Sequence, residues 1–98
     1  MFLKVINSYR KVIAICDEEL IGKRFEEERF QLDVKENFFK EEKVSEEELV
    51  KIIQNMSRED ATFNIIGEKS INTALKAGII SQEAVGKIKG IPFALVLI

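Results

Sequence analysis

The stretch Ala61–Ile80, ATFNIIGEKSINTALKAGII, constrains the fold most, because it has the pattern of a strand, a glycine, a helix and a second glycine. Thr62 and Phe63 are β-branched and aromatic residues of the kind that favour a buried strand. Gly67 then predicts a sharp turn in a backbone conformation that other residues avoid. The helix after it has apolar residues at three- and four-residue spacing, and Gly78 is its expected left-handed C-cap. The rest of the chain is therefore expected to pack on a strand–turn–helix unit.

Length and composition predict one small globular domain, residues 1–98, with 46% hydrophobic and 33% charged residues. The net charge of −2 argues against a protein that coats nucleic acid by bulk electrostatics. The charge is uneven, however. Residues 1–60 carry 11 Lys and Arg against 15 Asp and Glu, a balance of −4, and residues 61–98 carry four Lys against two Glu, a balance of +2. The C-terminal part is therefore the more basic one.

The chain has no histidine and a single cysteine, Cys16. The lack of histidine removes the commonest general base and the commonest metal ligand. Cys16 cannot form an internal disulfide, and its carboxylate neighbours oppose a reactive thiolate, so a buried hydrophobe is expected there. No apolar run reaches the ~20 residues of a membrane span, and the N-terminus lacks a signal-peptide pattern. These features predict a cytoplasmic protein, and the sequence assigns no cofactor, metal site or catalytic residue. High Glu, Lys and Ile without Trp favours a thermophilic source.

The N-terminal third predicts a hairpin followed by a turn. Residues Phe2–Asn7 and Lys11–Cys16 are apolar runs joined closely enough to pair as antiparallel strands. Asp17 is expected to cap a short helical turn that ends at Gly22. Residues 24–28 are mostly charged and are expected to be exposed, with no strand predicted there.

The middle of the chain predicts a strand, a loop and a helix. Phe30, Leu32 and Val34 alternate with polar residues, as in a half-buried strand. Residues 37–43 are expected to form a loop that holds two aromatic side chains against the core. Ser45 opens a capping-box pattern that predicts a helix ending near residue 57.

The C-terminal residues 93–98 are continuously apolar, which predicts a strand buried on both faces. A short turn or a single helical turn is expected over residues 81–85. The elements together predict an α+β fold: a mixed or mainly antiparallel sheet of about five or six strands with two main helices.

One candidate binding site surrounds the predicted Gly67 turn. Gly67, Glu68 and Lys69 precede Ser70 as at the end of a phosphate-binding loop, but Glu68 interrupts the pattern and no earlier glycine is present. A plain strand-to-helix turn is the favoured interpretation, with a weaker anion site at the helix N-terminus as the alternative. The polar residues that could join a pocket there are Asn64, Asp17 and Lys23.

A second candidate site is the basic segment Gly86–Gly90, in which Lys87 and Lys89 lie between glycines. Lysines on a mobile backbone could contact phosphates. The usual glycine loop of nucleic-acid-binding domains has two residues between its glycines, whereas this segment has three, so a simple connection between strands is favoured. The acidic runs 26–28, 41–42 and 46–48 are expected to be solvated, or to dock a basic protein such as a ribosomal protein.

The order of these segments resembles an archaeal family, the domain of unknown function 424, over nearly the whole chain. The segments that carry the resemblance are Val12–Lys23, Val44–Glu48, Asn64–Lys69, Ala77–Ile80 and Gly90–Pro92. The resemblance implies an archaeal cytoplasmic protein of about this size. It implies no established activity, and it suggests an association with the translation machinery.

Three functions follow from these observations. The first is a non-enzymatic binding module that docks on a ribosomal particle or a translation factor, with RNA contact through Lys87 and Lys89. The second is a small-molecule or nucleotide-binding enzyme with its site at the Gly67 turn. The third is a structural protein that forms a homodimer through an exposed sheet edge or a helix stripe.

Overall fold

The structure is a computed structural model that describes residues 1–56 and 60–97. It contains a six-stranded sheet in the order β5-β1-β2-β6-β8-β7 and a two-stranded sheet of β3 and β4. The strands are β1 (Phe2–Ile6), β2 (Lys11–Cys16), β3 (Arg24–Glu27), β4 (Phe30–Asp33), β5 (Glu42–Lys43), β6 (Ala61–Ile66), β7 (Gly86–Ile88) and β8 (Ile91–Leu97). The helices are α1 (Glu36–Phe39), α2 (Glu46–Met56) and α3 (Glu68–Ala77), with short 3-10 turns η1 (Glu18–Leu20) and η2 (Gln82–Ala84).

The predicted α+β fold is confirmed, including the six-stranded sheet and the two long helices α2 and α3. The predicted β1–β2 hairpin is antiparallel, and so are the other neighbouring pairs of the large sheet except β2 and β6, which are parallel. The predicted end of α2 near Ser57 and the last residue of the predicted final strand, Ile98, lie outside the described residues. Within the described ranges, no helix combines the length and apolar character needed to cross a membrane.

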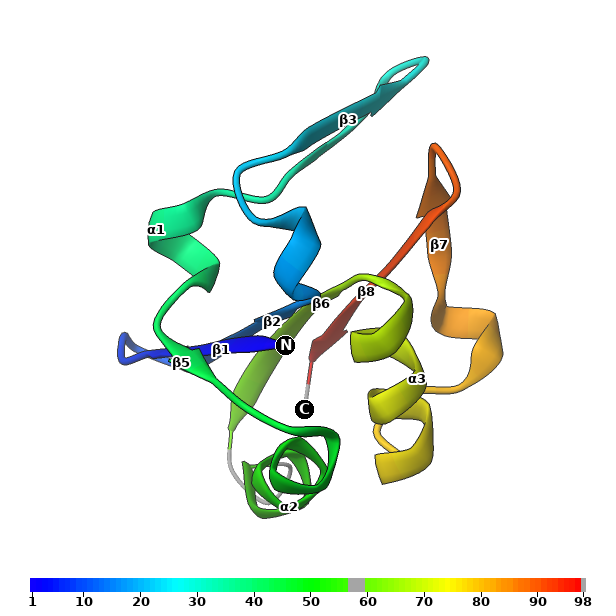
Figure 1. Ribbon diagram of the computed structural model, residues 1–98. Helices are drawn as coiled ribbons and strands as arrows, with labels where there is room; N and C mark the ends of the chain where they lie inside the picture. Colours follow the sequence, from blue (N-terminus) through cyan, green and yellow to red (C-terminus); the bar gives the residue numbers. More distant parts are fainter. Residues whose placement is uncertain (57–59, 98) are drawn as a thin grey trace.

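The large sheet separates two hydrophobic clusters (Figure 1). One face, the helix face, packs against α2 and α3. Its buried side chains include Leu3, Ile13, Ile15, Ala61, Phe63, Ile65 and Ala94 from the strands, with Leu49, Ile53, Ile71 and Ala74 from the two helices. These helix positions belong to the apolar stripes that periodicity predicts, so local pattern and burial agree.

The other face, the hairpin face, packs against η1, the β3–β4 hairpin and α1. Figure 1 shows α1 and the hairpin on the opposite side of the sheet from α2. The buried side chains of this cluster are Ala14, Cys16 and Ile66 from the sheet centre, with Leu20, Leu32, Val34, Phe39 and Ile88 around them. The small side chains of Ala14 and Cys16 leave room for the bulky ones that cover them.

The helix ends follow the sequence closely. The Glu48 backbone N–H donates to Ser45 Oγ at 3.2 Å and the Ser45 N–H donates to Glu48 Oε1 at 3.1 Å, which confirms the predicted capping box of α2. At the end of α3, Gly78 has φ 81°, and the Ile79 N–H donates to the Ala74 carbonyl. The predicted left-handed C-cap is therefore present.

The expected exposure of residues 24–28 is confirmed, apart from Phe25, which is half-buried. Residues 24–27 also form a strand, β3, that the sequence did not predict, because β4 supplies an antiparallel partner. The expected loop over residues 37–43 instead contains the single-turn helix α1 and the short edge strand β5, which pairs with β1. The predicted half-buried strand is present as β4, and Leu32 and Val34 are buried as expected. Phe30, in contrast, is 65% exposed, since the β3–β4 hairpin projects beyond the sheet (Figure 1).

The prediction that the C-terminal strand is buried on both faces is also wrong. Leu95 is 61% exposed and Leu97 is 72% exposed, whereas Ala94 is buried on the helix face. Both leucines lie on the hairpin face, since they pair with Asn64 and Thr62 of β6. The elements that cover the hairpin face reach only the end of the sheet near Cys16 and Ile66. The apolar run of β8 does not indicate how far this cover extends, so the sequence alone predicts burial on both faces.

Candidate functional site

The predicted residues Asp17, Gly67 and Lys69 meet where the parallel strands β2 and β6 end. Asp17 follows β2 directly, and its backbone N–H donates to the Ile66 carbonyl at 3.0 Å. Asp17 is buried, with 3% of its surface exposed. Ser70 Oγ and the Ser70 N–H donate to Asp17 Oδ1 at 2.7 and 2.8 Å, and the Lys69 N–H donates to Oδ2 at 3.0 Å. Asp17 therefore caps α3 from a distant part of the chain.

This differs from the capping role that the sequence suggests for Asp17. The residue does precede η1, but its side chain makes no capping hydrogen bond there. A carboxylate favours the positive end of a helix, and α3 is a ten-residue helix whereas η1 has three residues. The Asp17 side chain thus stabilises the longer helix through residues that lie 52 and 53 positions further along the chain, a pairing that local sequence does not predict.

Gly67 is required at this corner for two reasons. Its φ of 113° and ψ of 154° lie in a region that side chains other than glycine rarely adopt. A Cβ atom at this position would also lie 2.3 Å from Asp17 Cγ. The prediction of a special backbone conformation at Gly67 is confirmed, and the close approach of Asp17 adds a second constraint.

The first amides of α3 are consequently already bound to an anion, the Asp17 carboxylate. An exogenous phosphate would have to displace a buried carboxylate that accepts three hydrogen bonds. Cys16, next to Asp17, is buried, and this desolvation, helped by the Asp17 charge, raises the pKa of its thiol to about 12. The thiol is therefore protonated at neutral pH, the form that disfavours nucleophilic attack.

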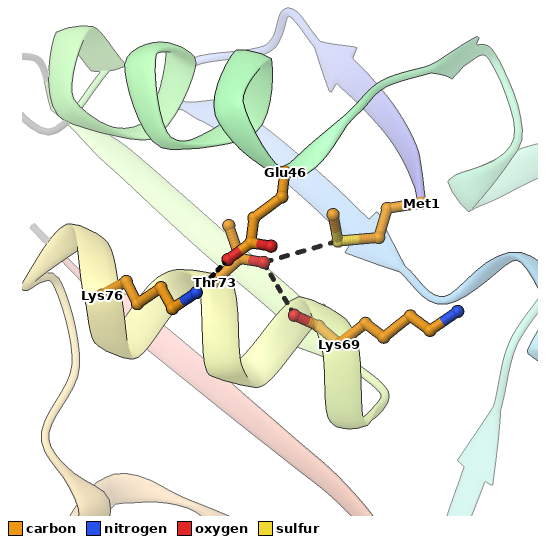
Figure 2. Close-up of polar contacts among 5 residues, drawn as sticks. All are labelled: Met1, Glu46, Lys69, Thr73 and Lys76. Carbon is orange, nitrogen blue, oxygen red and sulfur yellow. Dashed lines mark hydrogen bonds and ion pairs between the residues drawn. The ribbon is translucent and has the colours of Figure 1, made fainter.

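An open groove of about 610 Å³ lies beside this corner, between the start of α2 and the exposed side of α3. Its polar lining includes Glu46, Lys69, Thr73 and Lys76 (Figure 2). Lys76 Nζ forms an ion pair with Glu46 Oε1 at 2.5 Å, and Thr73 Oγ1 donates to the Lys69 carbonyl at 2.8 Å. In Figure 2 the Lys69 side chain points away from the ion pair.

A smaller groove of about 270 Å³ lies on the other side of α3 and is lined by Glu68 and Lys87 among others. The two lysines of the basic segment are both exposed. Lys89 has φ 53° in the turn between β7 and β8, and its N–H donates to Glu27 Oε1 of the β3–β4 hairpin at 3.2 Å. The basic segment therefore lies beside acidic side chains.

The structure does not bring Asn64 or Lys23 to this corner of the sheet. Asn64 lies on the hairpin face, opposite to α3, where it pairs with Ala14 and Leu95. Lys23 is exposed at the start of the β3–β4 hairpin, where its carbonyl accepts from the Val34 N–H at 2.9 Å.

Sequence reasoning missed the role of Ser70 and the exposure of two leucines in β8. Ser70 is fully buried and binds Asp17 with both its hydroxyl and its N–H. Near this corner, the exposed Glu18 forms an ion pair with Lys43 at 2.8 Å, which lowers the pKa of the Glu18 carboxyl. Among residues 1–56 and 60–97, no group of three or more Asp, Glu or Cys side chains is placed to hold a metal ion.

These features define a small α+β protein in which the Asp17 carboxylate is held by hydrogen bonds at the start of α3 and open grooves lie along that helix. The chain belongs to the family described as protein of unknown function (DUF424), whose model matches residues 6–98. The predicted resemblance is thus confirmed. No curated protein matches the chain significantly.

The fold is similar to that of an uncharacterized conserved protein from the archaeon Methanopyrus kandleri, solved as a crystal structure. The TM-score is 0.85 at 21% sequence identity, and the match covers 98% of this chain and 90% of the other. At this identity the comparison supports the fold and carries no information on activity.

Proposed function

We propose that the chain is a non-enzymatic binding module of the cytoplasm that docks on a translation-related RNA–protein particle. A binding role is favoured over catalysis because the two side chains most suited to act as a base or a nucleophile, those of Asp17 and Cys16, are buried in structural contacts. The Asp17 carboxylate accepts three hydrogen bonds at the N-terminus of α3, and the Cys16 thiol is buried with a pKa raised to about 12.

The link to translation rests on the expectation attached to the family and on the exposed Lys87 and Lys89. The Lys89 N–H is bound to Glu27, so the basic turn and the acidic hairpin form one surface of mixed charge. Such a surface suits a protein component of a particle better than bare RNA, because neighbouring carboxylates repel phosphates. The contact is therefore expected to be with protein.

Gradient sedimentation of a native lysate tests this proposal. The protein should move with a ribosomal or factor-sized particle, and Lys87→Glu with Lys89→Glu should return it to the top of the gradient. A double variant at two other exposed lysines, Lys35→Glu with Lys51→Glu, has the same net charge and should still sediment with the particle. Residence of the wild-type protein wholly at the top would contradict the proposal.

Treatment with RNase separates the two kinds of contact within such a particle. If the docking is through protein, this chain should stay attached to the protein core that survives RNase. Release by RNase would instead show that RNA provides the contact, and the inference from the mixed-charge surface would be wrong.

A second candidate function, a small-molecule-binding enzyme, is favoured only by the larger groove along α3. Its volume of about 610 Å³ is in the range of ligand pockets, and Lys69 is exposed at its wall. Nucleotides and small phosphorylated acids should then raise the melting temperature of the wild-type protein and not that of Lys69→Ala. No stabilisation by any of these ligands would count against this function.

A further inference from the structure

Among residues 1–56 and 60–97, no strand pairs with the outer edge of β8 over its second half. β7 pairs with β8 only through the contacts of Gly86 with Phe93, Lys87 with Pro92 and Ile88 with Ile91. On its inner side β8 continues to pair with β6 as far as Leu97. Residues 94–97 therefore form an edge strand that is held in an extended conformation on one side only.

The direction of the backbone groups on this edge follows from the register. The Gly67 N–H donates to the Pro92 carbonyl at 2.9 Å, so Pro92 directs its carbonyl toward β6. Alternate residues of a strand direct their N–H and C=O groups to opposite edges. Leu95 and Leu97 consequently direct both groups outward, where β7 does not reach.

The side chains on this edge are apolar as well as exposed. Leu95 and Leu97 are 61% and 72% exposed on the hairpin face, and no residue of β8 is charged. The neighbouring half-buried positions on the same face are Ile6, Val12 and Thr62, which extend the uncovered surface across the sheet. An edge without charges or a bulge is a template for another strand.

The opposite edge of the sheet is built differently. β5 covers β1 only at Phe2 and Leu3, and the residues of β5 are Glu42 and Lys43. Beyond them, the Lys4 ammonium lies next to the sheet edge and donates to the Asn37 carbonyl of α1. Charged side chains protect this edge, so it is a poor partner for the apolar edge of β8.

We propose that β8 of a second copy of this chain pairs with residues 94–97 in an antiparallel manner about a two-fold axis at Val96. Leu95 of each copy then faces Leu97 of the other, and their outward N–H and C=O groups form four hydrogen bonds. The leucines of both copies cluster on one face of a continuous twelve-stranded sheet, since each copy contributes its six-stranded sheet. This edge-to-edge contact is isologous, so it closes at two copies.

A second copy is the occupant because the edge complements itself. Both strands offer the same two apolar side chains and the same pattern of donors and acceptors, and neither brings a charge to the contact. A charged partner strand would place its charges against Leu95 and Leu97. This assembly uses no residue of the β7–β8 turn, so it stands whether or not the chain docks on a particle.

The oligomeric state as a function of concentration tests the proposal. Analytical ultracentrifugation from about 1 µM to about 500 µM should show a monomer–dimer equilibrium. Leu97→Lys should weaken the dimer at least about tenfold, because it places two charges in the contact. Phe30→Lys changes an equally exposed apolar residue on the distant β3–β4 hairpin and should leave the equilibrium unchanged. A wild-type monomer throughout this range would overturn the proposal.

A cysteine cross-link checks the register without relying on affinity. Val96 would face its own counterpart in a non-hydrogen-bonded pair, at a Cα separation of about 4.5 Å, which suits a disulfide. Val96→Cys should therefore form a dimer on a non-reducing gel after mild oxidation, whereas Phe30→Cys should not. Cys16 is buried and does not compete. A failure of Val96→Cys to cross-link, or equal cross-linking of Phe30→Cys, would contradict the register.

Discussion

The Asp17 corner and the β8 edge differ in how their polar groups are satisfied. At the corner, Asp17 is buried and accepts three hydrogen bonds from Lys69 and Ser70. On the edge, Leu95 and Leu97 expose both their side chains and their outward backbone groups. The polar residues of the corner, which resemble a binding site in composition, bind one another within the fold. The apolar residues Leu95 and Leu97 of β8, which resemble a core segment in composition, are exposed. The proposal that β8 is a contact surface therefore rests on unmet hydrogen-bonding and burial capacity and not on polar composition.

The largest expected effect is at Gly67. Gly67→Ala should lower the free energy of unfolding by roughly 3 kcal/mol or more, because the new Cβ meets Asp17 and the backbone is strained. Gly22→Ala is the matched control: its φ is 79° and a Cβ there has no neighbour within 4 Å, so only about 1 kcal/mol is expected. Urea denaturation measures both. Equal losses for the two variants would contradict the close packing of Asp17 against Gly67.

The next effect concerns the Asp17 carboxylate itself. Asp17→Ala should cost about 2–4 kcal/mol, since it leaves the buried Ser70 hydroxyl and two α3 amides without their acceptor. Asp17→Asn keeps one side-chain oxygen and should cost about half as much. The same denaturation experiment applies. A loss below about 0.5 kcal/mol for Asp17→Ala would show that the corner does not stabilise the fold.

A smaller effect distinguishes the open edge from the corner. If two copies pair through β8, the melting temperature of the wild-type protein should rise by about 3 °C for each tenfold increase in concentration. Leu97→Lys should remove this dependence and change the melting temperature little at low concentration, because residue 97 is exposed. Calorimetry at two concentrations measures both. Concentration dependence that persists in Leu97→Lys would place the contact elsewhere.

The smallest effect is at the α2 capping box, which lies away from both regions. The Ser45 N–H and hydroxyl lower the pKa of the Glu48 carboxyl below its ordinary value. A carboxyl whose pKa is lower in the folded state stabilises the fold above its unfolded pKa, and this contribution disappears as the pH falls through its folded pKa. The melting-temperature advantage of wild type over Glu48→Gln should therefore shrink on acidification into that range. Glu47→Gln, at an exposed neighbour without this capping contact, is the control.

Local sequence predicts the two long helices, α2 and α3, and the central strands well. Capping residues and periodicity identify α2 and α3. Gly67 and Gly78 mark the two positions at the ends of α3 where the backbone has a positive φ. Strand β3 escapes prediction because its pairing with the predicted strand β4, and not its own composition, makes residues 24–27 extended. The short charged strand β5 is likewise extended because it pairs with β1.

The candidate site is harder to predict, because its decisive contacts join distant residues. Asp17 reaches Ser70, 53 positions along the chain, and no local pattern signals that pairing. The exposure of Leu95 and Leu97 depends on how far the covering elements of the hairpin face extend. Both properties are set by tertiary structure and not by the residues themselves.

Residue-resolved amide hydrogen exchange at two protein concentrations tests the contrast between the corner and the edge most directly. The N–H groups of Lys69 and Ser70, bound to Asp17, should be strongly protected at both concentrations. The N–H groups of Leu95 and Leu97 should exchange fast in dilute solution and become protected when two copies pair. Protection of Leu95 and Leu97 in dilute solution, no gain at high concentration, or fast exchange at Lys69 and Ser70 would contradict the account.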